Sequence, residues 1–281
     1  MQNDKSKHRI LILGVSGFIG SALYKELYAY LKVFGTYRTP QPYLKKNKQF
    51  FNYNIEEDDI YEILNVTKPT IVISALRGDF HSQIIAHGHL AEYAGAHKVK
   101  IIYLSSANVF DAYSKYPSYE TDQTLSNSIY GHFKIKLENM LLKLPKRQVA
   151  IIRLPMVFGN NCPRNNEIKE NLIQNLAVEV FPNLIMNVTL DTKLTQQIHY
   201  IINRNKYGIF HLGSTDLVHH DEFVKELITI YSTQPLRLKR VYTTNEDRYL
   251  AVLTKYNKLP NHLQITSKQI LQELNKTVDT N

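Results

Sequence analysis

Tyr130 and Lys134 are the side chains whose types and spacing point most directly to chemistry. Residues four apart lie on one face of a helix, so a phenol and an ammonium group are expected side by side. The positive charge stabilises a phenolate, which lets Tyr130 give a proton to a carbonyl oxygen as a hydride adds to the carbon. The spacing alone is common in a chain with 19 tyrosines, so a third member is needed.

Ser106 supplies that third member. It follows the apolar run 100–104, which is expected to form a buried parallel strand. The carboxyl ends of such strands are where open α/β sheets bind ligands. From this place Ser106 is expected to hydrogen-bond the reacting oxygen, so the three residues together predict a catalyst of carbonyl reduction or alcohol oxidation.

A glycine-rich loop follows the first predicted strand and opens the first predicted helix. Glycines permit a tight turn and a close approach of the backbone, and a helix amino terminus offers N–H groups and a positive dipole end to a pyrophosphate. The loop therefore predicts a bound dinucleotide. The residues expected to contact it are Gly14, Ser16, Gly17, Phe18, Ile19 and Gly20.

Arg38 lies at the end of the second predicted strand, where an acidic residue would accept a hydrogen bond from the ribose 2′-hydroxyl of NAD. The segment 34–38 contains no acid, and a guanidinium group is suited to pair with a 2′-phosphate. A solvated surface arginine is the alternative. The sequence favours NADPH over NADH.

Short apolar runs alternate with amphipathic stretches, which is typical of parallel strands joined by helices. Strands are expected at Ile10–Leu13, Lys32–Tyr37, Thr70–Ser74, Lys100–Leu104 and Val149–Arg153. Helices are expected near Phe18–Leu31, Asp58–Asn65, Ser82–Ala94 and Ile129–Leu144. The fold class predicted is α/β, with a Rossmann-like doubly wound parallel sheet.

The pattern loosens after Gly159, where residues 160–166 are expected to form a polar loop. Helices are then expected at Glu167–Val178, Asp191–Asn203, Asp221–Tyr231 and Ser267–Asn275, with a short strand at Gly208–Leu212. We expect a dinucleotide-binding domain over 1–159 and a smaller substrate-binding lobe over 160–281, with elements that interleave.

Composition limits the class of protein. The chain of 281 residues carries 34 Lys+Arg and 25 Asp+Glu, a net charge of +9, but its basic residues are spread along the whole sequence. We therefore expect no nucleic-acid partner. The single cysteine, Cys162, excludes an intrachain disulfide and receives no chemical role. Glycines interrupt the apolar amino-terminal run, and no stretch is long enough to span a bilayer, so a cytoplasmic protein without membrane contact is expected.

Taken together, these motifs resemble the extended short-chain dehydrogenases/reductases, and among them the dTDP-4-dehydrorhamnose reductase branch of the NAD-dependent epimerase/dehydratase family. The resemblance covers nearly the whole chain. It is carried by the glycine loop, by the turn 105–111, and by Glu120-Thr121-Asp122 followed by Tyr130-Gly131 and Lys134. Further on come Arg153-Leu154-Pro155, Val157-Phe158-Gly159, and Gly208 to Gly213.

The resemblance implies roles for individual residues. Tyr130 is the proton donor, Lys134 also holds the nicotinamide ribose, and Ser106 polarises the carbonyl. Pro155 is expected beside the nicotinamide. Asn54, which replaces an aspartate usual in the family, and Ala75 and Leu76 complete the expected cofactor contacts.

Departures from the reductase pattern leave the substrate open. Where that branch usually has Thr followed by Asp-Tyr, this chain has Ser106 followed by Ala107-Asn108, as in sugar epimerases. Met156 replaces an asparagine of many epimerases. A dehydratase usually carries an Asp-Glu pair after the catalytic hydroxyl, and Ala107 and Asn108 can serve neither role. The hypothesis is an NADPH-dependent ketoreductase of a nucleotide-linked 4-keto-6-deoxy sugar. An epimerase with bound NAD and a non-catalytic NADP-binding regulatory protein are the alternatives.

Other polar residues receive weaker interpretations. Asn108 is expected to contact substrate, and Arg77 and Arg164, placed in loops, either bind its diphosphate or are solvated. The histidines at 81, 87, 89 and 97, and the pair His219-His220, are expected to be structural or solvated, with Asp221 capping a helix. We predict no metal, and a homodimer is a further expectation.

Overall fold

The computed structural model describes residues 8–232 and 237–278. Within them the chain forms two compact units whose segments alternate in sequence. The first unit comprises residues 8–105, 133–152 and 198–209, and the second comprises 106–132, 153–197 and the described part of 210–281. Segment 106–132 therefore groups with the second unit and not with the sheet that precedes it.

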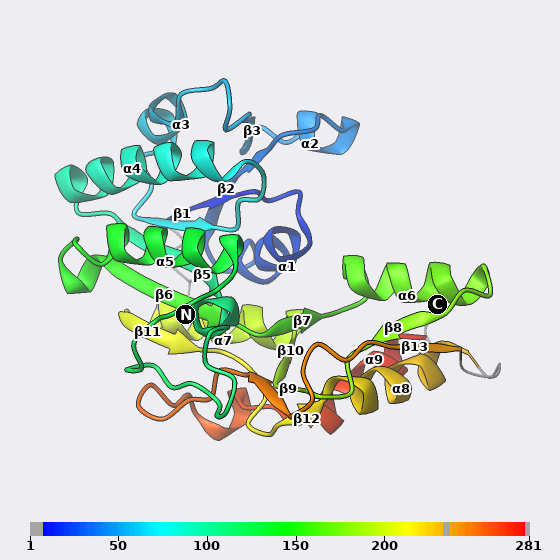
Figure 1. Ribbon diagram of the computed structural model, residues 1–281. Coiled ribbons are helices and arrows are strands. Elements are labelled where there is room, and N and C mark those ends of the chain that lie inside the picture. Colours follow the sequence, from blue (N-terminus) through cyan, green and yellow to red (C-terminus); the bar gives the residue numbers. More distant parts are fainter. Residues whose placement is uncertain (1–7, 233–236, 279–281) are drawn as a thin grey trace. The chain divides into compact units, whose positions relative to one another are not determined.

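The first unit is built on one large sheet (Figure 1). Its strands are β1 (Arg9–Leu13), β2 (Lys32–Tyr37), β3 (Phe50–Asn52), β4 (Ile71–Ser74), β5 (Lys100–Ser106), β6 (Val149–Leu154) and β11 (Gly208–His211). Among the described residues the order is β11-β6-β5-β4-β1-β2-β3, and the pairs β2–β3, β1–β2, β1–β4 and β4–β5 are parallel. The chain thus leaves β1 to one side first and to the other side later, which makes the carboxyl end of β1 the switch point where such sheets bind ligands.

Helices cover this sheet because its strands are apolar on both faces. They are α1 (Phe18–Leu27), α2 (Pro42–Lys46), α3 (Ile60–Thr67), α4 (Phe80–His97), α5 (Ile129–Leu141) and α7 (Asp191–Asn203). Leu11 and Val72 pack with Leu90 of α4 and Leu137 of α5 in one cluster of fully buried side chains. Each such leucine contributes about 1.5–3 kcal/mol by leaving water.

The starts and ends of these helices are set locally. The side chains of Asp59 and Asp79 accept hydrogen bonds from backbone N–H groups of the first turns of α3 and α4. Lys68 and Lys98 end the same helices in the left-handed conformation, with φ of 43° and 56°. Short 3₁₀ turns, η1 (Ala107–Phe110), η2 (Lys146–Gln148) and η3 (Asn261–Leu263), connect other elements.

The second unit combines small sheets with three complete helices among its described residues, and the first residues of α5 and α7 also belong to it. The sheets pair β7 (Met156–Phe158) with β10 (Val188–Leu190), β8 (Val178–Val180) with β13 (Leu238–Arg240), and β9 (Leu184–Met186) with β12 (Val218–His219) and β14 (Arg248–Leu250). The helices are α6 (Pro163–Ile173), α8 (His220–Tyr231) and α9 (Ser267–Val278). Phe158, Val188, Phe223 and Ile270 lie in its buried core.

The predicted α/β class and Rossmann-like sheet are confirmed. Two sequence predictions about α6 are wrong. The helix begins at Pro163, inside the predicted loop 160–166, because a proline at the first helical position costs no hydrogen bond. It ends at Ile173: residues 174–177 connect it to β8, and Val178, the last residue of the predicted helix, begins that strand. Arg164 therefore lies on a helix and not in a loop.

Candidate active site

The glycine loop has the backbone that a pyrophosphate requires. Gly14 adopts φ +87°, and a Cβ there would lie 2.9 Å from the carbonyl oxygen of Ala75. A Cβ on Gly20 would lie 2.0 Å from the carbonyl oxygen of Gly14, so neither glycine has room for a side chain. Thr36 of β2 holds the loop, accepting at its Oγ1 from Gly14 N (2.9 Å) and at its carbonyl from Val15 N (2.8 Å).

The amino terminus of α1 is presented by this loop. Gly17 is its N-cap and supplies no side-chain hydrogen bond, and Ser16 and Gly17 are exposed. The backbone N–H groups of Phe18 and Ile19 thus belong to a helix start that no side chain of the N-cap satisfies. A diphosphate accepts hydrogen bonds from such groups and is favoured by the helix dipole. The loop fits the phosphates of a dinucleotide.

The other predicted cofactor residues follow the strands next to β1. Arg38 is exposed just after β2, and its carbonyl accepts from Asn52 Nδ2 at 2.8 Å. Ala75 follows β4 and donates its N–H to Leu13 O at 3.0 Å, with Leu76 half-buried beside it. Asn54 follows β3 and begins a turn, accepting at its Oδ1 from Glu56 N. All four lie within two residues of the end of a strand of one sheet.

Lys134 lies on α5 with its ammonium group in the interior. Only 6% of the residue is exposed. Its Nζ donates to the carbonyl of Leu104 at 3.0 Å and lies 4.8 Å from the centroid of the Tyr103 ring. Burial lowers the pKa of Lys134 to about 8, with the charge of Arg77 adding to this effect and the charge of Glu138 opposing it. The lysine is charged at neutral pH and close to its titration range.

Ser106 ends β5 and caps the turn η1. Its Oγ accepts from Asn108 N at 3.2 Å and donates to Asn108 Oδ1 at 2.9 Å. The hydroxyl is therefore hydrogen-bonded to the side-chain amide of Asn108, the residue predicted to contact substrate. A hydroxyl proton rotates to suit its acceptor, so the same group can donate to another oxygen in place of Asn108.

Asp111 holds the start of α5, which carries Tyr130. One carboxylate oxygen accepts from Ser126 Oγ at 2.8 Å and Asn127 N at 2.6 Å, and the other accepts from Ser128 Oγ at 2.5 Å. Burial raises the pKa of Asp111, but hydrogen bonds from these groups outweigh it and hold that pKa below its usual value. No local sequence signal marks this role of Asp111, because its partners lie 15–17 residues further along the chain.

Gly131 brings the start of α5 against the turn η1. A Cβ there would lie 2.0 Å from Ser126 Oγ and 2.3 Å from the carbonyl oxygen of Asn108. Its N–H donates to Ser128 Oγ at 3.0 Å, so Ser128 caps the helix. Tyr130, the preceding residue, is 40% exposed. Ser106, Asn108 and Tyr130 are thus carried on one closely packed part of the second unit.

Comparison with known proteins shows the family to which the chain belongs. A family model described as RmlD substrate binding domain matches residues 8–255. The chain belongs to this family. It is 27% identical over 160 residues to "Methionine adenosyltransferase 2 subunit beta" of Rattus norvegicus, covering 54% of this chain and 47% of that protein. It therefore spans about half the length of that relative.

Two further relatives bear the name of one enzyme. The chain is 25% identical over 239 residues to dTDP-4-dehydrorhamnose reductase of Aggregatibacter actinomycetemcomitans, covering 76% of each. The structure of dTDP-4-dehydrorhamnose reductase from Bacillus anthracis, in complex with NADP, has a TM-score of 0.75 at 19% identity, covering 95% of this chain and 98% of that one. The predicted membership in the extended short-chain dehydrogenases/reductases is confirmed.

Four of the motifs that carry the family resemblance contribute residues to one buried network. The guanidinium of Arg153 donates to the carbonyl of Glu120 and to His211 Nε2, each at 3.4 Å, and lies 4.7 Å from the centroid of the Phe110 ring. The Glu120 carboxylate accepts from backbone N–H groups of residues 255–257. Pro155, two residues after Arg153, is buried. These residues stabilise the second unit.

The remaining candidates are placed individually. Arg77 is exposed in the loop between β4 and α4, and Arg164 is exposed in the first turn of α6. His87 is buried between Ser74 Oγ (2.8 Å) and the carbonyl of Gln83 (2.6 Å). His81 is exposed, His89 lies against the ring of Tyr61, and His97 lies against that of Tyr93.

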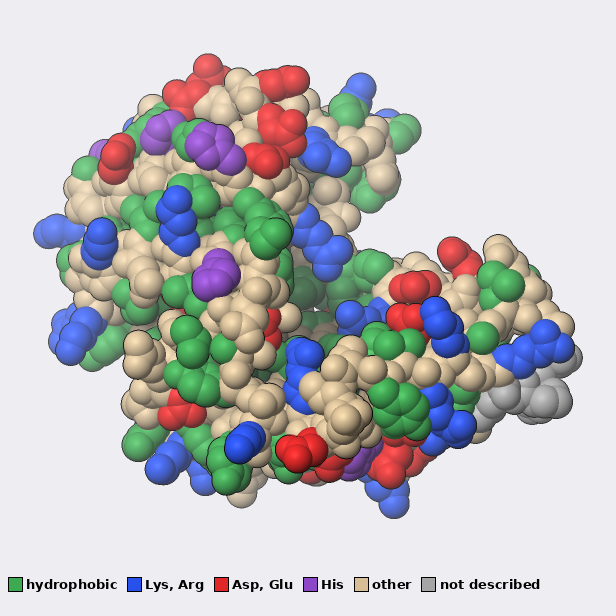
Figure 2. Space-filling model, viewed as in Figure 1, with side chains coloured by type: hydrophobic (Ala, Val, Ile, Leu, Met, Phe, Trp, Pro, Cys, Tyr) green, Lys and Arg blue, Asp and Glu red, His purple; other side chains and the backbone are tan. Residues whose placement is uncertain are grey.

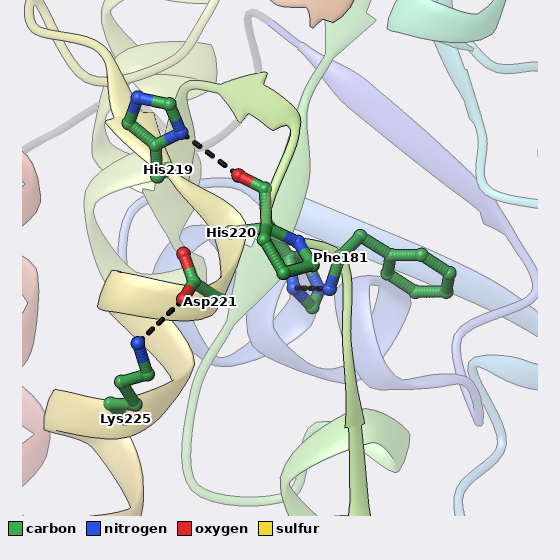
Figure 3. A network of polar contacts seen from close by, with 6 residues as sticks. Phe181, His219, His220, Asp221 and Lys225 are labelled. Carbon is green, nitrogen blue, oxygen red and sulfur yellow. Dashed lines mark hydrogen bonds and ion pairs between the residues drawn. The ribbon is translucent and has the colours of Figure 1, made fainter. Parts of the chain in front are cut away.

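The histidine pair before α8 also has structural partners (Figure 3). His219 Nδ1 donates to the carbonyl of Pro182, and His220 Nδ1 accepts from Phe181 N. The prediction that Asp221 caps the helix is wrong: His219 is the N-cap, and Asp221, inside the first turn, forms an ion pair with Lys225 at 2.5 Å. Over residues 8–232 and 237–278, no three His, Cys, Asp or Glu side chains are grouped to hold a metal ion.

The same described residues contain no helix long and apolar enough to cross a membrane. On the face shown in Figure 2, Lys and Arg side chains are spread among acidic and polar ones. The absence of nucleic-acid, membrane and metal partners, the homodimer and the cytoplasmic location stay predictions.

Proposed function

We propose that the protein is an NADPH-dependent ketoreductase of a nucleotide-activated 4-keto-6-deoxy sugar. The observation that carries the proposal is the arrangement of three side chains. Tyr130 and Lys134 lie one turn apart on α5, and Ser106 lies on the turn against which Gly131 packs. The reductase name shared by two relatives supports the substrate class.

Each of the three residues has a separate role in the proposed reduction. NADPH, when bound, supplies the hydride. Tyr130 gives a proton to the carbonyl oxygen that becomes the alcohol, and Ser106 donates a hydrogen bond to the same oxygen. The charge of Lys134 favours the phenolate that remains. Pro155 bounds the nicotinamide side, and Arg77, Asn108 and Arg164 bind the substrate.

Arg38 carries the preference for NADPH. It is exposed directly after β2, in the position where the 2′-substituent of the adenosine ribose is recognised in this fold. The segment that ends with it contains no carboxylate to accept from a 2′-hydroxyl. A guanidinium pairs with a phosphate through two parallel hydrogen bonds.

The test follows the absorbance of the reduced nicotinamide. Mixing the protein with NADPH and dTDP-4-keto-6-deoxy sugars should consume that absorbance and yield the alcohol. No consumption with any such substrate, together with NAD-dependent interconversion of a nucleotide sugar, would establish the epimerase alternative instead. Ala107-Asn108 after Ser106 is the feature that favours that alternative.

A second candidate belongs to another class, a non-catalytic NADP-binding regulatory protein. It is favoured by the match to a protein named as a subunit of a methionine adenosyltransferase. The presence of Ser106, Tyr130 and Lys134 together favours the reductase.

Tyr130→Phe separates the two candidates. We expect turnover to fall by about 10²-fold or more, because the proton donor is lost, while NADPH affinity measured by calorimetry stays unchanged. Tyr116→Phe, an exposed tyrosine of the same unit, is the matched control and should keep full turnover. If wild type has no turnover and the Tyr130→Phe protein keeps the NADPH affinity of wild type, the regulatory role would be supported.

A further inference from the structure

Glu138 is a buried carboxylate that the proposed chemistry does not use. It lies on α5 one turn beyond Lys134, and only 1% of the residue is exposed. Ser105 Oγ, at the end of β5, donates to Glu138 Oε1 at 2.5 Å. A hydroxyl donor at this distance suits an ionised carboxylate and fixes its orientation. A carboxylate taken out of water at this depth needs compensation, and a nearby cation provides it.

Lys134 is the corresponding buried cation. Its ammonium group donates to the backbone carbonyl of Leu104 at 3.0 Å and lies against the ring of Tyr103. Both stabilise positive charge, but neither carries a full negative charge. Removing an ammonium from water favours its neutral form strongly. Glu138, four residues further along the same helix, supplies the negative charge in reach.

We propose that Glu138 is a positioning residue that, held by Ser105, keeps Lys134 charged and pointing at the end of β5. Glu138 acts through the lysine and not by contact with substrate. Leu104, whose carbonyl binds the lysine, and Ser105, whose hydroxyl binds the glutamate, are consecutive residues of β5. One strand end therefore fixes both charges of the pair. The consequence for catalysis rests on the proposed function, whereas the charge state of Lys134 does not.

The titratable and aromatic groups that act on Lys134 come from several elements. Glu138 on its own helix raises its pKa, and Arg77 in the loop before α4 lowers it. His87 of α4 has a pKa of about 4, mainly through burial and further through the charge of Lys134, so it is neutral when the lysine titrates. Tyr103 of β5 contributes its ring. Of these groups, Glu138 carries the negative charge that favours the ammonium form near neutrality.

The experiment titrates Lys134 in the free protein. Lysine labelled with ¹³C at Cε reports its charge by NMR, and the signal of Lys134 is the one missing from the Lys134→Arg variant. In wild type the midpoint is expected at about pH 8. In Glu138→Gln, which keeps the shape and removes the charge, we expect it to fall by about one to three pH units. Glu138→Asp keeps a charge on a shorter side chain and should fall between the two.

Glu92→Gln is the matched control. Glu92 is an exposed carboxylate of α4 that accepts from the Tyr61 hydroxyl at 3.0 Å. Its replacement changes the net charge by the same amount, and Glu92 is not one of the charges that shift the pKa of Lys134. Its midpoint should equal that of wild type. The proposal would be overturned if the Glu138 variants that fold titrate Lys134 at the same pH as wild type.

The pH profile of reduction distinguishes this proposal from the function it rests on. If the protein reduces 4-keto sugar nucleotides, the alkaline loss of turnover should move to lower pH in Glu138→Gln by the same amount as the NMR midpoint. If no substrate is reduced, the proposed function fails while the NMR titration still decides the role of Glu138. A structural role alone would lower stability and leave the midpoint in place.

Discussion

Gly131 shows how a missing side chain sets the position of its neighbour Tyr130, the proposed proton donor. The neighbours that a Cβ would meet are Ser126 Oγ at 2.0 Å and the carbonyl oxygen of Asn108 at 2.3 Å. The carbonyl cannot move without shifting the turn that follows Ser106. The glycine is therefore needed for packing, and its φ lies outside the left-handed range. This contact fixes the position of the backbone at Tyr130, the preceding residue.

Gly131→Ala should consequently separate catalysis from cofactor binding. Forcing a methyl group into this contact is expected to cost about 1–3 kcal/mol of stability. Displacing Tyr130 by even a fraction of an ångström should lower kcat by about tenfold or more. Dinucleotide affinity should remain, because the glycine loop is untouched. Urea denaturation, steady-state kinetics and calorimetry measure the three quantities.

Gly88→Ala is the control for this substitution. Gly88 is also helical, but nothing lies within 4 Å of a Cβ built on it. Alanine there should raise the free energy of unfolding by up to about 1 kcal/mol, because it favours helix more than glycine does. A Gly131→Ala protein as stable and active as Gly88→Ala would contradict the role given to this contact.

At the scale of elements, Asp111 connects the turn after β5 to the first turn of α5. Its carboxylate accepts from Ser126, Asn127 and Ser128. Asp111→Asn leaves one oxygen to accept and adds an NH₂ group facing these donors. We expect a loss of about 1–3 kcal/mol of stability and faster hydrogen exchange over residues 126–131. Turnover should fall while the KM for NADPH is unchanged.

Asp122→Asn provides the comparison. Asp122 is exposed and accepts from Tyr119 N at 2.7 Å, so it is a carboxylate of the same segment that does not hold α5. Its replacement should leave turnover and exchange over residues 126–131 as in wild type. Equal effects of the two substitutions would show that Asp111 has no special connection to α5.

Which elements the sequence predicts depends on how each is stabilised. Lys32–Tyr37 and Asp191–Asn203 are predicted with correct bounds, since a buried strand and an amphipathic helix both have apolar residues at fixed intervals. The three-residue strands of the second unit, such as Val178–Val180, are too short for any period to appear. The bounds predicted for α6 are wrong because the first turn of the helix is polar and its start depends on Pro163.

The same contrast holds within the candidate site. Gly14, Ser106, Tyr130 and Lys134 are candidates from the sequence alone, because the chemistry proposed for them requires their types at short spacings. Asp111 and Glu138 are not found. Their partners are 15 or more residues away, and only the folded chain shows that Ser105 and Glu138, separated by 33 residues, are bonded. The residues proposed to act on substrate have local sequence signals, whereas the residues that hold them in place depend on tertiary contacts.

For the whole molecule, part of the net charge of +9 is structural. Lys100, Lys134 and Arg153 are each 6% exposed or less and donate to backbone carbonyls. Burial lowers the pKa of Lys100 to about 8. These charges lie inside the protein and cannot serve an external polyanion, which agrees with the spread of the remaining basic side chains in Figure 2.

Buried neutral histidines should dominate the response of stability to acid. His87, His211 and His220 are each 5% exposed or less, and burial, the largest cause in each case, lowers their pKa to about 4. Between about pH 4 and 6.5 the unfolded chain therefore binds more protons, and the free energy of unfolding must fall as pH falls. Each pKa unit of difference corresponds to about 1.4 kcal/mol.

His87→Gln tests this expectation by removing one of these groups. Glutamine can still bond to Ser74 Oγ or the carbonyl of Gln83 but does not titrate. Urea denaturation at several pH values should show a smaller slope of stability against pH between 4 and 6.5 than in wild type. His89→Gln, on the same helix beside the Tyr61 ring, should leave the slope unchanged. Equal slopes in wild type and His87→Gln would mean that His87 is charged in the folded state, and its burial between Ser74 and Gln83 would then need another explanation.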